Sequence, residues 1–406
     1  MSNTKVSASE RMRAVDGMPD RQPVGAEIDQ LCGLALKALP AMYRTDSRQF
    51  VQTVRKDPSA DAGLRQEGSS LRYSAIVALG LAWTAPRTQH SVLSGWTAAE
   101  LARHTTELSV QSGTDLGAVA LAGWARAEVA DEISEPVYHR LVTEVRAGTA
   151  QPMVDFAWTL TALLAALAVQ DRAELRQAAA IAAERLLAAQ GGNGIWGHHL
   201  PMSALARYRA HVGCFADQVY PIQALARYAR ATGDGRALAA ANRCARRIVE
   251  LQGPAGQWWW HYDARTGDVV EGYPVYSVHQ HAMAPMALFD LLEAGGADHR
   301  TAILDGLGWL RRHPEPGGAL IDQQTGAIWR KIGRREPRKA TRSLRAVSTS
   351  ISPNWRLRAL DTLFKPGELD YECRPYELGW LLYAWLSGGI SGARPPGIEP
   401  ATEAGG

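Results

Sequence analysis

Ionisable side chains recur in this sequence at a regular interval. Asp155, Asp217 and His279 stand 62 residues apart, and Glu372 takes the next equivalent position when the glycines that end the two corresponding helices are aligned. Carboxylates combined with an imidazole can act as general base and general acid. We therefore predict that these four residues are catalytic, and the alternative is that the acids only cap helices.

Aromatic and basic side chains close to these positions are predicted to bind a substrate. Trp259, Trp260 and His261 belong to the run WWWHYD, whose rings could stack on a sugar or line a cavity for an isoprenoid or a carbocation. Packing between helices is an equally good explanation for at least one of these tryptophans. The remaining predicted substrate anchors are Tyr220, His281, Arg374 and Tyr376.

A sequence repeat indicates the scaffold that must position these groups. The pattern Q-x-x-x-G-x-W occurs from Gln190 to Trp196 and again from Gln252 to Trp258, also 62 residues apart. An amphipathic segment precedes each copy, and a second helical segment that stops at glycine follows it. Each copy therefore predicts one helical hairpin, a unit that must stack on its neighbours to bury its apolar face.

Extending this register predicts an all-α fold, an (α/α)6 toroid of six hairpins, in a single domain over residues 25–390. In such a ring the inner helices are parallel, so their N-termini converge at one mouth and favour an anion there. A long insert, residues 318–370, precedes the last inner helix and could hold strand pairs. Residues 1–24 and 391–406 are predicted to be disordered tails. The predicted hairpins pair 26–44 with 71–84, 97–109 with 113–128, 135–148 with 153–168, 172–189 with 215–231, 235–251 with 277–293, and 299–312 with 374–387.

The Q-x-x-x-G-x-W pattern resembles the QW repeat of squalene-hopene and oxidosqualene cyclases, whose toroid is shared with protein prenyltransferase β-subunits. The resemblance implies that Gln190, Trp196, Gln252 and Trp258 tie one repeat to the next. The acidic DxDD and DDxxD motifs of terpenoid enzymes are absent from the sequence. The resemblance therefore implies the fold more strongly than the chemistry.

The resemblance also raises the question of zinc, which protein prenyltransferases hold with Asp, Cys and His near the end of an inner helix. Cys214, Asp217 and either His279 or His281 offer these residue types, but their order along the chain is different. We predict neither a bound metal nor another cofactor.

Composition and charge limit the classes of binding partner and the cellular location that we expect. The net charge of +3 over 406 residues gives no reason to expect nucleic acid as a partner. Four widely separated cysteines without a CxxC pair fit reduced thiols, and no apolar run has the length of a signal peptide or a membrane span, so a cytoplasmic location is predicted. Residues 330–345 carry eight Lys or Arg residues. They predict a peripheral membrane contact or an anion site, and a solvated loop is the alternative.

Three hypotheses for the function follow, in this order of preference. The first is an enzyme of the terpenoid cyclase or prenyltransferase type, which acts by acid/base chemistry on an isoprenoid in an apolar, aromatic cavity. The second is a carbohydrate-active enzyme, such as a glycosidase, lyase or epimerase, with a polar cleft on the same fold. The third is a binding scaffold without catalytic activity.

Overall fold

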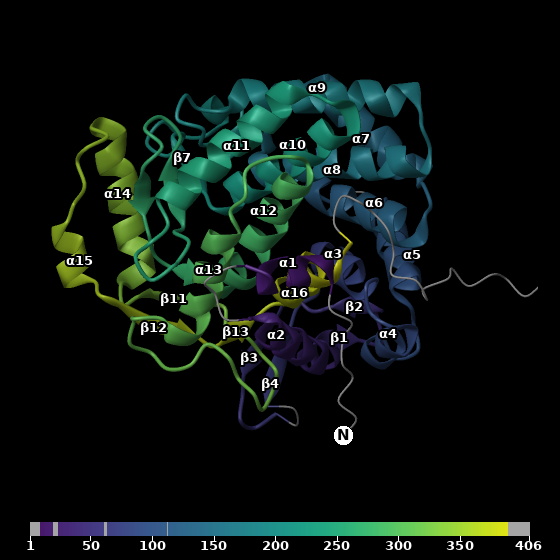
Figure 1. The fold of residues 1–406 in the computed structure, drawn as a ribbon, viewed down its shortest axis with the longest axis horizontal. Helices are drawn as coiled ribbons and strands as arrows, with labels where there is room; N and C mark the ends of the chain where they lie inside the picture. The colour runs from purple at the N-terminus through teal and green to yellow at the C-terminus, as the bar shows by residue number, and fades with distance from the viewer. Residues whose placement is uncertain (1–8, 19–22, 61–62, 112, 389–406) are drawn as a thin grey trace, which may run out of the picture.

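A computed structural model describes residues 9–18, 23–60, 63–111 and 113–388 (Figure 1). Six helices form an inner ring in which each helix packs on the next and the last packs on the first, so the ring is closed. This closure confirms the predicted all-α toroid. The inner helices are α3 (Leu71–Leu81), α6 (Leu116–Ala130), α8 (Met153–Val169), α10 (Ala216–Thr232), α12 (Ala284–Glu293) and α16 (Pro375–Leu386).

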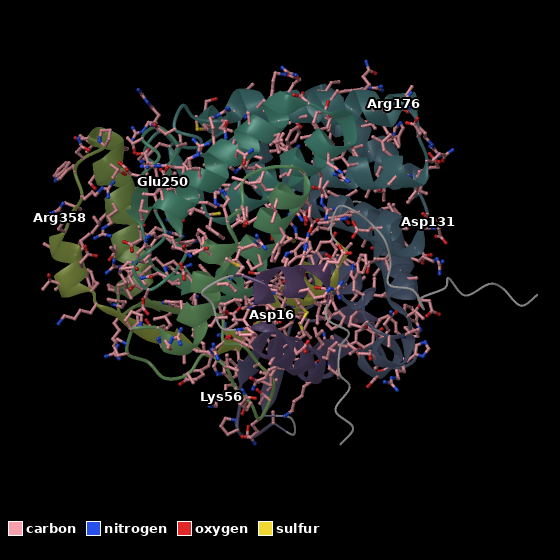
Figure 2. All side chains as sticks on the ribbon, in the orientation of Figure 1. Asp16, Lys56, Asp131, Arg176, Glu250 and Arg358 are labelled. Atoms are coloured by element: carbon pink, nitrogen blue, oxygen red, sulfur yellow. The ribbon has the colours of Figure 1, made fainter. Side chains whose placement is uncertain are left out.

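Six further helices surround this ring, one for each hairpin, as predicted. They are amphipathic because only one side faces the inner ring: in the outer helix at 235–250, for example, Ala237, Ala241, Cys244 and Ile248 are buried. Charged residues that Figure 2 labels, such as Arg176 and Asp131, lie at the outer edge. The outer helices are α2 (Gly25–Ala38), α5 (Ala98–Ser109), α7 (Glu135–Ala147), α9 (Ala173–Ala189), α11 (Gly235–Glu250) and α13 (Arg300–Arg312).

The two Q-x-x-x-G-x-W loops connect adjacent repeats as the resemblance implied. The Gln190 side-chain amide donates to the carbonyl oxygen of Ala240 in α11 at 2.8 Å, and Gln252 donates in the same way to Ala302 in α13 at 2.9 Å. The glycine of each pattern has φ +88°, a conformation that a side chain would strain. Each glutamine therefore links its loop to the following outer helix.

Short antiparallel strands lie at the mouth where the inner helices begin, because several of them lead directly into an inner helix. Strand β5 precedes α8, β7 precedes α10, β10 precedes α12 and β13 precedes α16. The sheets are β1 (Tyr43–Arg44) with β2 (Gln49–Phe50); β13 (Glu372–Cys373), β3 (Thr53–Lys56) and β4 (Leu64–Glu67); β5 (Gln151–Pro152) with β6 (His199–Leu200); β7 (Val212–Cys214), β8 (His261–Asp263) and β9 (Val269–Glu271); and β10 (Val275–Tyr276), β11 (Lys331–Arg334) and β12 (Pro366–Asp370).

The insert contains regular structure. Strands β11 and β12 pair there, which confirms the expected strand pair, and α14 (Ala340–Ile351) and α15 (Ala359–Leu363) form the projection at the left of Figure 1. A short helix, α4 (Pro86–Val92), lies between the first two hairpins, and one π-helical turn (His279–Met283) precedes α12. Short 3-10 turns cover Leu39–Met42, Met202–Ala204 and Pro337–Lys339.

The prediction of a disordered tail over residues 1–24 is wrong for residues 10–16, and residues 1–8 and 19–22 lie outside the described residues. Glu10–Asp16 form helix α1, which packs on α2 and α16, and Arg11, Met12 and Val15 are buried. The predicted tail 391–406 lies outside the described residues. Among the residues that the structure describes, no helix has both the length and the apolar character needed to cross a bilayer.

Candidate active site at one mouth of the ring

The four predicted catalytic residues lie at the same mouth of the ring. Asp155 and Asp217 occupy the first turns of α8 and α10, His279 begins the π-helical turn before α12, and Glu372 lies in β13 just before α16. All four side chains are buried. The repeat register therefore places equivalent residues correctly, although it says nothing about their partners.

Asp155 is held by a bidentate ion pair. Arg72 donates from its two terminal nitrogens to the two carboxylate oxygens of Asp155, both at 2.8 Å, and also pairs with Asp115. Burial raises the pKa of Asp155 and outweighs the opposing effect of Arg72, while the nearby charge of Asp217 raises it further. A carboxyl group with a raised pKa is suited to proton transfer near neutral pH.

Asp217 is fully buried and joins a histidine that the sequence analysis did not select. Its Oδ2 lies 2.9 Å from Nδ1 of His198 and accepts a 2.6 Å hydrogen bond from the backbone N–H of Cys214. The hydrogen bond and the charge of Asp217 raise the pKa of His198. The His198 side chain is 36% exposed, so it connects this buried carboxylate to solvent.

Glu372 lies among arginines. Its carboxylate pairs with Arg374, with Arg330 at 3.5 Å and with Arg55 at 3.5 Å. Although burial acts in the opposite direction, Arg330 and Arg374 lower the pKa of Glu372. Glu372 is therefore better suited to hold these cations in place than to exchange protons, which argues against the predicted catalytic role.

A second carboxylate, Glu377, was missed by the sequence analysis. It is fully buried in α16, where its Oε1 accepts a 3.2 Å hydrogen bond from Nε of Arg330. Burial raises the pKa of Glu377 to about 7. Its position in an apolar helix gave no sequence signal, because only the folded chain brings Arg330 from the insert to it.

Aromatic rings line the centre of the mouth. Tyr220 packs edge-on against Trp158, with ring centroids 4.9 Å apart, and Tyr73 lies 4.7 Å from Tyr376. The Tyr73 hydroxyl accepts a 3.0 Å hydrogen bond from Arg374. Tyr73 thus contacts both Arg374 and Tyr376, and Tyr220 is 3% exposed. The role of these residues in binding a substrate stays a prediction.

The two predicted histidines of the π-helical turn, His279 and His281, differ in their surroundings. His279 packs between Phe215 and Tyr276, whose tilted rings have centroids 4.5 and 5.0 Å away, and burial lowers its pKa to about 3. His281 is completely buried in the π-helical turn, and burial likewise lowers its pKa to about 3. Full burial leaves His281 no surface for a ligand, so its predicted role as a substrate anchor is not supported.

The tryptophans that follow the second Q-x-x-x-G-x-W loop divide between packing and the site. Trp259 packs against Tyr273, whereas Trp260 stacks on His261 at 3.9 Å and has the guanidinium of Arg342 5.1 Å from its ring centre. Burial lowers the pKa of His261 well below its usual value. The charges that lower it further belong to Arg342, Arg209, His198 and Lys339. These four side chains therefore lie near His261.

The basic segment 330–345 is only partly the exposed patch that its composition predicts. Arg334 and Arg345 are buried, and both pair with Glu271, at 3.0 and 2.9 Å. Arg330 turns inward to Glu372 and Glu377. Three of the eight basic residues are thus paired with buried carboxylates rather than available to a partner. Arg342 and Lys339 from the same segment lie near His261.

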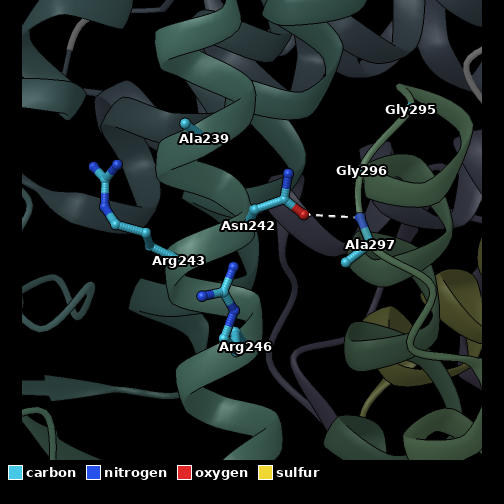
Figure 3. A pocket seen from close by; sticks show the side chains of 7 residues that line it. All are labelled: Ala239, Asn242, Arg243, Arg246, Gly295, Gly296 and Ala297. Carbon is cyan, nitrogen blue, oxygen red and sulfur yellow. Dashed lines mark hydrogen bonds between the residues drawn. The ribbon is translucent and has the colours of Figure 1, made fainter.

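A hollow of about 550 Å³ lies elsewhere, on the outside of the ring. Figure 3 shows it between α11 and the turn after α12, where Asn242 accepts a 2.8 Å hydrogen bond from the backbone N–H of Ala297. Arg243 and Arg246 line one side. None of the candidate site residues lines this hollow.

No protein-family model and no curated protein matches the chain. Several solved structures are similar in fold. An unsaturated glucuronyl hydrolase from Bacillus sp. GL1 is 14% identical, with 88% of this chain and 95% of that chain covered and a TM-score of 0.54. An unsaturated glucuronyl hydrolase from Streptococcus agalactiae is 10% identical (94% and 96% covered, TM-score 0.55), and a D-mannose isomerase is 13% identical (89% and 96% covered, TM-score 0.57).

These similarities establish the α/α toroid over most of the chain. They agree with the part of the predicted resemblance that concerns the fold, but the similar structures are carbohydrate enzymes by name and not terpenoid cyclases. The mouth itself is rich in paired charges, with Asp155, Asp217 and Glu372 beside Arg72 and several further arginines. Neither finding favours an apolar isoprenoid cavity, which was the first hypothesis.

Proposed function

We propose that this protein is a carbohydrate-active enzyme whose substrate is a saccharide with a carboxylate group. One observation carries the proposal: the mouth of the ring holds both a buried carboxylate with a raised pKa and a cation, Arg342, that packs on Trp260. Asp155 lies in the first turn of α8, and Arg209 and Lys339 add positive charge near His261. An acid/base group and cations at the same mouth suit a reaction on an anionic sugar.

Asp155 is the proposed proton donor and acceptor. Its pKa is raised by burial, and Arg72 fixes its orientation through two hydrogen bonds. Positioned acid/base groups typically contribute about 10²–10⁴-fold to a rate. Trp260 is half-buried between the stacked ring of His261 and the guanidinium of Arg342, so it holds this cation beside the site.

The cations near Trp260 and His261 are proposed to hold the carboxylate of the substrate. Arg342 is well placed because its guanidinium is held over Trp260, so it could pair with the carboxylate of a sugar. The names of two similar structures, both unsaturated glucuronyl hydrolases, agree with a sugar acid as substrate class. The third similar structure is named a D-mannose isomerase, so neutral sugars are also included in the test.

The test is a turnover assay on matched pairs of saccharides. Oligosaccharides that end in an unsaturated or saturated uronic acid are compared with the same oligosaccharides ending in neutral hexose, and mannose and polyprenyl diphosphates complete the panel. We expect turnover of a uronate substrate, a loss of at least about 10²-fold in kcat for Asp155→Asn, and mainly a higher KM for Arg342→Ala.

Asp131→Asn is the matched control, since Asp131 is exposed at the C-terminal end of α6, where the inner helices end rather than begin. Turnover of polyprenyl diphosphates and of no sugar would restore the isoprenoid hypothesis. Sugar turnover that Asp155→Asn leaves unchanged would remove Asp155 from the mechanism, and inactivity on the whole panel would favour the scaffold hypothesis.

A further inference from the structure

Three different metal-binding side chains meet at the start of α10. One nitrogen of His198, the Sγ of Cys214 and a carboxylate oxygen of Asp217 all lie within 4.8 Å of one another. Zinc bonds of about 2.0–2.3 Å allow two ligand atoms of the same ion to be up to about 4 Å apart. Side-chain rotations that move the ligand atoms by about 1 Å would therefore let all three bind one ion. Nitrogen, thiolate and carboxylate are all zinc ligands.

Asp217 carries an independent sign of a ligand. The side chain is completely buried, and no hydrogen bond of normal geometry reaches its Oδ1 from the residues that the structure describes, although the Cys214 thiol lies close enough to interact with the carboxylate. Leaving a buried carboxylate oxygen without a partner is costly, because the group has lost its hydration. A cation bound between Asp217, His198 and Cys214 would satisfy this oxygen.

The three groups are held together by a rigid clamp. The side-chain amide of Gln218, next to Asp217, accepts a hydrogen bond from the backbone N–H of Trp196 and donates one to its carbonyl oxygen, both at 2.9 Å. It also donates to the carbonyl oxygen of Cys214 at 3.0 Å. Gln218 thereby fixes the loop that carries His198 and the strand that carries Cys214 onto the same turn of α10.

Gly213 allows this close approach. A Cβ atom at this position would lie 2.0 Å from the carbonyl oxygen of Trp196, so the two backbones touch where the loop and β7 meet. Only glycine leaves room for such contact. The ligand-bearing segments are therefore positioned before any ion arrives, which lowers the ordering cost of binding.

The next repeat has a glutamine equivalent to Gln218 but lacks the three metal-binding side chains. Gln280, 62 residues after Gln218, accepts a hydrogen bond from Trp258 N–H at 3.2 Å and donates to the carbonyl oxygen of Tyr276 at 3.0 Å. The positions equivalent to His198, Cys214 and Asp217 are Trp260, Tyr276 and His279, which pack as neighbouring aromatic rings. The fold thus needs the glutamine at this place but does not need the His/Cys/Asp set.

We propose that His198, Cys214 and Asp217 bind one divalent ion of the zinc type. The ligand set has one thiolate and one carboxylate, whose two charges balance the ion. Three protein ligands would leave one position of a tetrahedral site for water or another ligand, and the 36% exposed side chain of His198 gives solvent access to the cluster. The inference goes beyond the proposed function and does not depend on which substrate the mouth accepts.

The experiment measures metal in the full-length chain without substrate. We expect about one equivalent of zinc by elemental analysis after purification without chelator, and with cobalt(II) a thiolate-to-metal charge-transfer absorption. Cys214→Ser should abolish this absorption, and His198→Gln and Asp217→Asn should each weaken cobalt binding at least about 10-fold. Cys32→Ser is the matched control, since Cys32 is a buried cysteine in α2, and it should bind cobalt like the wild type.

Circular dichroism and thermal unfolding identify any variant that fails to fold, and the two conservative variants, His198→Gln and Asp217→Asn, then decide the result. Wild-type protein that binds neither zinc nor cobalt stoichiometrically overturns the inference, and so does an absorption that persists in Cys214→Ser. Sugar turnover by a protein that binds no metal overturns only the metal site. Metal binding by a protein that turns over no substrate of the panel overturns only the proposed function.

Discussion

Replacing Arg11 by methionine tests how strongly helix α1 is fixed to the ring. The Arg11 guanidinium is buried and pairs with Asp290 and Glu293 of α12, and it donates to the carbonyl oxygen of Ala384 in α16 at 3.1 Å. Methionine keeps most of the apolar volume but removes every one of these interactions. The variant therefore isolates the polar contribution of one side chain at the mouth where the inner helices end.

The expected loss is about 3 kcal/mol in the free energy of unfolding. Removing one partner of a buried ion pair costs about 3–5 kcal/mol, because the other charge stays buried. Asp290 keeps Arg227, at 2.7 Å, and Gln223, at 3.0 Å, so we expect the lower end of this range. Arg236→Met is the control: this arginine pairs with Glu184 on the surface and is 67% exposed, so its loss should cost less than about 1 kcal/mol.

Guanidinium unfolding followed by circular dichroism measures both variants, with equal denaturant slopes required for the comparison. The pH dependence adds a second readout. Burial would raise the pKa of Asp290, but Arg227 and Arg11 lower it below the usual 3.8. The stabilisation is therefore complete above pH 3.8 and is lost as the pH falls through the lower folded-state pKa. Equal unfolding midpoints for the Arg11 and Arg236 variants at neutral pH would refute the reasoning.

Three further outcomes are expected. Gln218→Ala should lower the free energy of unfolding by about 2–4 kcal/mol, because the backbone N–H and carbonyl of Trp196 stay buried and lose their hydrogen-bond partner. Gln280→Ala should lower the free energy of unfolding by a similar amount, measured by denaturant unfolding. Only the Gln218 variant should also weaken cobalt binding. Burial raises the pKa of Glu377 from 4.5 to about 7, so the thermal stability of the wild type should fall relative to Glu377→Gln as the pH rises through that interval, and parallel pH profiles would contradict this. Ile351 and Trp355, which follow the basic segment 330–345 on the projecting insert, are 69% and 52% exposed, so pelleting of the protein with phosphatidylserine vesicles should be lost when both become aspartate. Equal pelleting of wild type and variant would exclude these two residues from the contact, and a wild type that does not pellet would reject the predicted membrane contact through 330–345.

The hairpins and the ring were predictable because they solve the same local problem repeatedly. Each Q-x-x-x-G-x-W loop needs a glutamine, a left-handed glycine and a buried tryptophan, and these leave a pattern that can be read from one copy to the next. The spacing then placed Asp155, Asp217 and His279 at equivalent positions. Periodicity carries this information because helical packing depends on residues a few positions apart.

Helix α1 and the basic insert were not predictable in the same way. The seven residues of α1 are too few to show a helical pattern, and its stability comes from Arg11 and its distant partners on α12. In the insert, the number of positive charges predicts an exposed patch, but it cannot reveal that Arg334 and Arg345 share the buried carboxylate of Glu271. Long-range ion pairs leave no local signature.

The sequence by itself determined the repeat, the number of hairpins and the mouth at which the candidate residues lie. Only the tertiary structure decided which of them are neighbours. It brought His198 and Cys214 to Asp217, surrounded Glu372 with arginines and buried His281. The physical reason is that a repeat fixes the backbone position of a residue, whereas its chemistry depends on side chains that irregular loops deliver from elsewhere in the chain.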